Sequence, residues 1–199
     1  MQRYRQTLGR PVTADDVFYS VYGQLHDPAY RQAYAADLAR TLPRIPTPQT
    51  TARFEQLVEA GRALAELHLN YETAEPYPLQ ITVAPGVDPH DRETWRVSKM
   101  KWVTRGEHTA ITYNPKVRIS GIPEVAERYQ IGSRSAVGWL LDRYQRKVDK
   151  PSGIVNDPND WCDEHDDPRY IITLIEKVTT VAVRTMEIVD SLPAPEKQG

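Results

Sequence analysis

The 199-residue chain has a single cysteine, Cys162, and no apolar run long enough to cross a membrane. One cysteine cannot form an internal disulfide or a cysteine-rich zinc site, and this predicts a reducing compartment. The first residues are polar and basic, unlike the apolar core of a signal peptide. We therefore expect a cytoplasmic protein without a membrane partner.

Several catalytic signatures are also missing. The sequence has no glycine-rich loop that runs into Gly-Lys-Ser/Thr, no dinucleotide-binding glycine pattern and no serine nucleophile elbow, and nothing marks Cys162 as a nucleophile. By elimination we expect no catalytic residue, metal or cofactor in this chain. The formal net charge of -2 argues against a purely electrostatic DNA binder. A site-specific binder with a local basic face remains compatible with it.

The spacing of apolar residues predicts helices at both ends of the chain and strands in the middle. Thr13 and Asp16 have the pattern of a capping box, Asp27-Pro28 is a second helix start, and a third helix is expected over 52–69. Period-two alternation predicts antiparallel strands at 79–83, 95–103, 110–114 and 117–119. Helices are expected again over 135–144 and from Asp167-Pro168 to just before Pro193.

These elements indicate an α+β fold with a central antiparallel sheet of four or five strands and a long C-terminal helix. We expect three parts: a helical segment over 1–75, a mixed α/β domain over 76–193 and a disordered tail over 194–199.

Basic side chains concentrate in the predicted sheet. Alternation places Lys99 and Lys101 on one face and Met100 and Trp102 on the other. Such a face could bind DNA phosphates or could simply be solvated. Arg134 precedes a predicted helix, where it could clamp a phosphate, or Ser133 could be a plain N-cap beside a solvated arginine. The phosphate-binding candidates are Lys99, Lys101, Arg105, Lys116 and Arg134.

A long polar stretch at 149–167 is predicted to be an ordered loop, with Ile154, Val155 and Trp161 as apolar anchors. Asn156 and Asn159 could contact adenine edges, and Trp161 could stack or wedge in DNA. A self-packed loop with Asx turns and a buried tryptophan is the alternative. The acidic run from Asp157 to Asp167 could hold a metal, but its spacing matches no known metal loop, and capping of turns is the simpler reading.

Three stretches resemble the carboxy-terminal region of type ISP restriction-modification enzymes. They are Val21-Tyr22-Gly23-Gln24-Leu25-His26-Asp27-Pro28 with its continuation to Pro46, Ile119-Ser120-Gly121-Ile122-Pro123, and Gly132-Ser133-Arg134-Ser135-Ala136 continuing through Ser152-Gly153-Ile154-Val155-Asn156-Asp157-Pro158-Asn159-Asp160-Trp161 to Ile171. The resemblance extends from about Val17 to Pro193. The third stretch is its most specific part.

The resemblance implies a role in recognising the DNA target within one long bacterial polypeptide that defends against phage. Upstream domains would be a nuclease, an ATP-driven translocase and an adenine methyltransferase, with ATP, Mg and S-adenosylmethionine as the parent enzyme's cofactors. Double-stranded DNA and those upstream domains are then the expected partners.

Two other functions stay open at this point. The chain could be a structural module that docks the methyltransferase onto the translocase without touching bases. It could also be a metal-dependent hydrolase that uses the acidic run. A continuous positive face on the sheet and adjoining loops would favour DNA recognition. An exposed apolar patch on the N-terminal helices with no positive groove would favour docking, and converging carboxylates in a cleft would favour hydrolysis.

Overall fold

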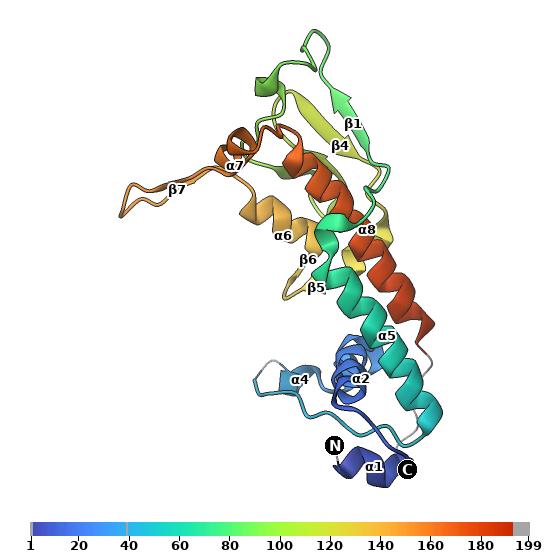
Figure 1. Ribbon diagram of the computed structural model, residues 1–199. Helices are drawn as coiled ribbons and strands as arrows, with labels where there is room; N and C mark the ends of the chain where they lie inside the picture. Colours follow the sequence, from blue (N-terminus) through green and yellow to red (C-terminus); the bar gives the residue numbers. More distant parts are fainter. Residues whose placement is uncertain (1, 39, 193–199) are drawn as a thin grey trace. The chain divides into compact units, whose positions relative to one another are not determined.

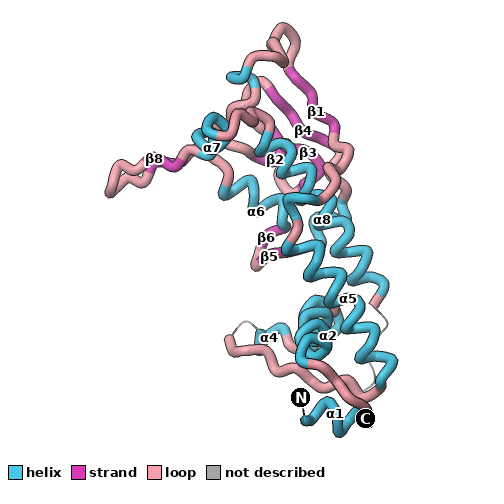
Figure 2. Tube along the Cα trace, viewed as in Figure 1, coloured by secondary structure: helices cyan, strands magenta, loops and turns pink. Residues whose placement is uncertain are grey.

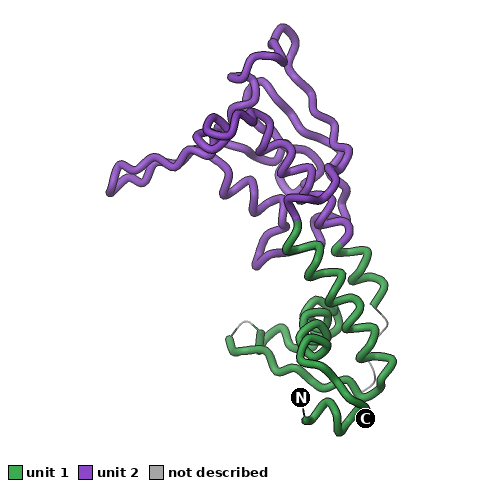
Figure 3. Tube along the Cα trace, in the orientation of Figure 1, with its two compact units in different colours: residues 1–70, 185–199 green, residues 71–184 purple. Residues whose placement is uncertain are grey.

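The computed structural model describes residues 2–38 and 40–192, which form two compact units (Figure 3). Unit 1 comprises residues 1–70 and 185–199, and unit 2 comprises residues 71–184. The tail expected at 194–199 lies outside the described residues. Across 2–38 and 40–192, no helix combines the length and apolar character of a membrane span.

Unit 1 is built from helices, and their start signals match the sequence. The Thr13 side chain accepts a hydrogen bond from the Asp16 amide, and the Asp16 carboxylate accepts one from the Thr13 amide, which completes the expected capping box. Asp27 caps the next helix, with Pro28 in its first turn. That helix ends at Ala33, and Tyr34 separates it from a second short helix. The helices are α1 (Gln2–Leu8), α2 (Ala14–His26), α3 (Pro28–Ala33), α4 (Ala35–Leu38) and α5 (Thr51–Leu69).

Two glycines let α2 and α5 pack backbone against backbone. A Cβ on Gly61 would lie 1.9 Å from the carbonyl oxygen of Tyr19, and one on Gly23 would lie 2.5 Å from that of Leu57. A buried ion pair between Arg53 on α5 and Asp27 at the start of α3, with 2.5 Å between Nη2 and Oδ2, ties these helices together. Close packing at two glycines and one buried ion pair therefore hold α2, α3 and α5 together.

Unit 2 is organised around a four-stranded antiparallel sheet, which confirms the expected α+β class (Figure 2). The strand order is β1-β4-β3-β2, and Ile111 on β3 pairs with Ile119 on β4, both fully buried. Apolar side chains of α6 and α8 join these residues in one core. The course of both helices can be followed in Figure 1. The elements are β1 (Gln80–Val83), β2 (Lys101–Thr104), β3 (Glu107–Thr112), β4 (Val117–Ser120), α6 (Ala136–Arg143) and α8 (Tyr170–Ser191), with 3-10 turns η1 (Tyr71–Thr73), η2 (Arg92–Thr94) and η3 (Glu124–Arg128).

The strand expected over 95–103 is wrong for residues 95–100, because regular pairing begins only at Lys101. Trp95 and Val97 are buried as the alternation predicts, but their backbone has side-chain partners instead of a neighbouring strand. The Asn114 amide donates to the carbonyls of Thr94 and Arg96, and the Asn159 amide bonds to both backbone polar groups of Val97. Two asparagines thus satisfy the groups that a strand would have paired.

The polar stretch over 149–167 is not an irregular loop. It contains one strand of a small hairpin, formed by β7 (Lys147–Val148) and β8 (Val155–Asn156), and a short helix, α7 (Pro158–Glu164). The prediction that Ile154 and Val155 anchor this stretch is wrong, since these residues are 67% and 46% exposed. A second small hairpin, β5 (Gln130–Ile131) with β6 (Arg134–Ser135), leads directly into α6.

Candidate nucleic-acid interface

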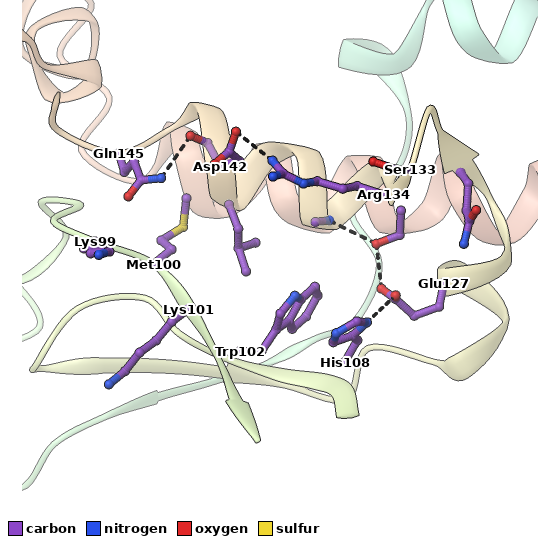
Figure 4. Close-up of a pocket in the computed structure, with 14 residues that line it drawn as sticks. Lys99, Met100, Lys101, Trp102, His108, Glu127, Ser133, Arg134, Asp142 and Gln145 are labelled. Atoms are coloured by element: carbon purple, nitrogen blue, oxygen red, sulfur yellow. Dashed lines mark hydrogen bonds and ion pairs between the residues drawn. The ribbon is translucent and has the colours of Figure 1, made fainter. Parts of the chain in front are cut away.

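A cleft of about 520 Å³ opens in unit 2 between β2–β3, the β5–β6 hairpin and α6 (Figure 4). Its floor includes the rings of Trp102 and His108 together with Glu127 and Ser135, and its rim carries Lys99 and Lys101 on one side and Arg134 and Asp142 on the other. The lining of the cleft therefore includes Arg134 and two lysines that precede it by more than thirty positions in the sequence.

A chain of side-chain contacts fixes the floor. The indole of Trp102 stacks on the imidazole of His108, with 4.5 Å between the ring centroids and 26° between the planes. Nδ1 of His108 lies 2.5 Å from Oε2 of Glu127, whose other oxygen accepts a hydrogen bond from Oγ of Ser135 at 2.7 Å. Ser135 Oγ also accepts from the amide of Gly138 at 3.1 Å and so caps α6. The aromatic floor is thereby tied to the start of the helix that forms the opposite wall.

The two sides of the rim differ in how their charge is used. Nη1 of Arg134 lies 2.8 Å from Oδ2 of Asp142, and this hydrogen bond is the main reason why the pKa of Asp142 falls below its ordinary value. Lys99 and Lys101 are exposed, and neither forms an ion pair within residues 2–38 and 40–192. The two lysines are therefore the rim cations that an incoming anion would meet without breaking an existing pair.

The capping role expected for Ser133 falls to Ser135 instead. Ser133 lies in the turn of the β5–β6 hairpin, two residues too early to reach the first amides of α6. Arg134 consequently lies on β6, the strand that leads into α6. Its guanidinium pairs with the carboxylate of Asp142 on that helix.

Two other basic candidates do not line this cleft. Arg105 lies in the turn between β2 and β3, and Lys116 lies in the turn between β3 and β4, at the opposite end of β3. Nζ of Lys116 donates to the carbonyl of Glu93 at 3.4 Å. The basic residues of the sheet therefore do not form one continuous patch around the cleft.

The candidates in the polar stretch have three different environments. Asn156 is exposed on β8, whereas Asn159 is only 5% exposed and its amide is bonded to Val97 and Asp157. Trp161 is 40% exposed; its ring stacks on His165 and contacts Tyr170 at a tilt of 35°, with 3.9 Å between centroids in each pair. Asn159 therefore holds the fold and is unavailable for base contact in this conformation.

The acidic run is used for capping and ion pairing. The Asp157 carboxylate caps α7 through the amide of Asn159, and that of Asp163 pairs with Arg96 at 2.8 Å and with Arg92 at 3.5 Å. Within the described part of the chain, no group of three His, Cys, Asp or Glu side chains is placed to hold a metal ion. These contacts give the acidic residues structural roles.

Sequence reasoning missed the residues of the cleft floor. His108, Glu127 and Ser135 come from three separate elements, and no short motif links them. The alternation that placed Trp102 opposite Lys101 was the one available signal, but it could not show that His108 would lie beneath the indole ring.

Comparison with protein families gives a match to the Type ISP C-terminal specificity domain over residues 1–174. This chain belongs to that family. The resemblance seen in the sequence is thus confirmed over most of the specificity domain, and comparison with curated proteins gives no match.

Solved structures similar to this specificity domain come from three large enzymes. A nuclease-deletion mutant of the Type ISP restriction-modification enzyme LlaGI, in complex with a DNA substrate mimic, has 41% identity over 94% of this chain and a TM-score of 0.80. The ATP-dependent Type ISP enzyme LlaBIII bound to DNA has 36% identity over 100% of it and a TM-score of 0.82. A DrdV–DNA complex has 28% identity over 98% of it and a TM-score of 0.78.

The specificity domain spans only a small part of those three proteins. It covers 17% of the LlaGI chain, 12% of the LlaBIII chain and 19% of the DrdV chain.

Proposed function

We propose that this specificity domain recognises the DNA target of a single-chain restriction-modification enzyme. Three similar structures are DNA complexes, and in two of them the region matched to this chain is 41% and 36% identical. The observation that carries the proposal is the cleft that Lys99, Lys101 and Arg134 line together with the stacked rings of Trp102 and His108. Ammonium and guanidinium groups on a rigid surface bind phosphates and fix the register of a protein on the duplex.

The chemistry of the parent enzyme would lie outside this chain. We propose an upstream nuclease, an ATP-dependent translocase that uses Mg, and an adenine methyltransferase that uses S-adenosylmethionine, all acting in the cytoplasm where the DNA is. The specificity domain itself would hold none of these cofactors and would have no catalytic residue. Its part would be to select where the methyltransferase and the nuclease act.

The test is a salt titration of DNA binding by the full-length enzyme and its variants. Lys99→Ala and Lys101→Ala should each lower the slope of log affinity against log salt by about one unit if each lysine meets a phosphate. Affinity should fall alike for cognate and unrelated duplexes, because phosphates carry no sequence information. Arg184→Ala is the matched control, since Arg184 is an exposed cation of α8 that does not line the cleft. Normal slopes for both lysine variants, with a reduced slope for Arg184→Ala, would place DNA on another face.

A docking role is favoured by one separate observation in unit 1. Phe18, Leu42 and Leu69 are 60%, 88% and 81% exposed, which is unusual for large apolar side chains. We propose that this helical unit contacts the upstream domains of the same polypeptide while unit 2 contacts DNA. Serine at Phe18 and Leu69 should then weaken methylation and cleavage without changing which sequence is methylated.

A further inference from the structure

The β7–β8 hairpin projects from the body of unit 2 (Figure 1). Its apolar side chains are exposed. Val148 and Val155 are cross-strand partners and share one face of the hairpin, with 50% and 46% of each residue exposed. Ile154, beside them at the tip, is 67% exposed. An isolated two-stranded ribbon is marginally stable in water, so an uncovered apolar face on one points to a partner.

Local hydrogen bonds give the tip of the hairpin a defined shape. The carboxylate of Asp149 accepts hydrogen bonds from both the amide and the hydroxyl of Ser152, each at 2.9 Å. Across the ribbon, the amide of Asp149 donates to the carbonyl of Ile154 at 2.9 Å. Gly153 has φ of 71°, a left-handed conformation that glycine adopts without strain. The tip therefore presents Ile154 in a fixed turn.

The base of the hairpin is pinned to the wall of the cleft. The amide of Arg146 donates to the carbonyl of Ser98 at 3.3 Å, and its guanidinium lies 3.4 Å from the Asp157 carboxylate. Nζ of Lys147 donates to the carbonyl of Asp142 on α6 at 2.5 Å. Because Asp142 also pairs with Arg134, the ribbon starts beside the rim of the proposed phosphate-binding cleft.

The charge of this segment indicates what covers it. Residues 143–156 carry four basic side chains and one acidic side chain, although the whole chain has a net charge of -2. The one carboxylate, that of Asp149, is engaged by Ser152 within the tip. Lys150, next to it, is exposed and forms no ion pair within the described ranges. Arg146 and Lys147 are paired with Asp157 and Asp142, so Lys150 is the free cation beside the exposed apolar side chains. Such a combination matches a DNA groove, where phosphates flank base edges and thymine methyl groups.

We propose that the β7–β8 hairpin enters a groove of duplex DNA and that Val148, Ile154 and Val155 make apolar contact with the bases there. The major groove, about 12 Å wide, admits a two-stranded ribbon. Lys150 then meets a phosphate at the edge of the groove. This inference rests on the proposed function and assigns base contact to the hairpin, separately from the phosphate contacts of the cleft.

The experiment measures the affinity of the full-length enzyme for two duplexes, one with the sequence that the enzyme methylates and one with that sequence shuffled. Ile154→Ser and Val155→Ser should each weaken binding to the duplex with the enzyme's own target sequence by about tenfold, the loss typical of one mismatched base pair. Binding to the shuffled duplex should change little. Val103→Ser is the matched control, because Val103 is 40% exposed on β2 and lies outside the hairpin.

A shortened hairpin tests whether the length of the hairpin matters for DNA binding, separately from the chemistry of single side chains. Replacing residues 149–154 by Asn-Gly joins the paired Val148 and Val155 through a two-residue turn and removes Ile154 from the tip. The preference for the target sequence over the shuffled sequence should fall further than in either serine variant. Unchanged preference in all three variants overturns the inference. A lowered unfolding temperature of the enzyme with unchanged preference would overturn it too, by showing that the hairpin packs against another domain.

The same titrations separate this inference from the proposed function. If Lys101→Ala lowers the salt slope but the hairpin variants keep normal preference, only the hairpin inference fails. If the hairpin variants lose preference and Lys101→Ala keeps the normal slope, the cleft is the part that is wrong.

Discussion

The side-chain amide of Asn159 bonds to both backbone polar groups of Val97, accepting from its amide at 2.8 Å and donating to its carbonyl at 3.0 Å. These two bonds connect α7 to the segment before β2, and both residues are buried. The asparagine thus acts as a one-residue substitute for a neighbouring strand.

Removing that amide should destabilise the domain. Asn159→Ala leaves the amide and carbonyl of Val97 buried without partners, and each such group costs about 1–3 kcal/mol. We expect a lower free energy of unfolding for Asn159→Ala in chemical denaturation. Asn156→Ala, at an exposed asparagine in the same stretch, should stay within about 0.5 kcal/mol of the wild type. Equal stability of the two variants would contradict the structural role given to Asn159.

The sequence predicts the parts of this fold that local signals control. The capping box of Thr13 and Asp16, the Asp27-Pro28 helix start and the strand ending at Ser120 are all encoded within a few residues. The segment before β2 is different, because its conformation depends on Asn114 and Asn159, which lie 17 and 62 positions beyond Val97. Alternation gave the right buried side chains there but could not show that side chains would replace a strand.

The candidate site was predicted only in part for a similar reason. Charge and alternation identified Lys99, Lys101 and Arg134, which the fold brings to one cleft. The same reasoning grouped Lys116 with them, but Lys116 does not line the cleft, and its Nζ donates to the carbonyl of Glu93. The His108–Glu127–Ser135 contacts required tertiary structure from the outset.

The glycine at the α2–α5 crossing predicts an effect of unusual sign. In an exposed helix, replacing glycine by alanine stabilises by about 1 kcal/mol. Gly61→Ala should instead destabilise by about 2 kcal/mol or more, because the new Cβ would overlap the carbonyl oxygen of Tyr19. Thermal unfolding of the chain measures this. Ala63→Gly, at an exposed position of the same helix, gives the ordinary propensity loss for comparison. Stabilisation by Gly61→Ala would refute the close packing.

Two histidines in unit 1 predict how stability depends on pH. Burial, together with the nearby His26, lowers the pKa of His68 to about 4, and burial also lowers that of His26. Nδ1 of His68 lies 2.8 Å from the Tyr22 hydroxyl, and its Nε2 lies 2.9 Å from that of Thr185. The folded state thus holds His68 neutral at pH values where the unfolded chain, with a pKa near 6.5, binds a proton.

Because the unfolded state takes up the proton first, stability should fall as pH decreases from about 6.5 towards 4. Above pH 6.5 this group should have little influence. The measurement is the unfolding temperature of the chain across that range. His68→Gln removes the titrating group and should flatten the curve, and a curve of unchanged steepness in that variant would assign the effect to other groups.

The most direct test of the central claim is to exchange this specificity domain for that of LlaGI, which is 41% identical, in the full-length enzyme that carries it. The methylated DNA sequence is then read in cells that express each enzyme. If the domain selects the target, the exchanged enzyme methylates the sequence of the donor of the domain. Methylation of the original sequence by an active exchanged enzyme would show that recognition lies elsewhere in the polypeptide.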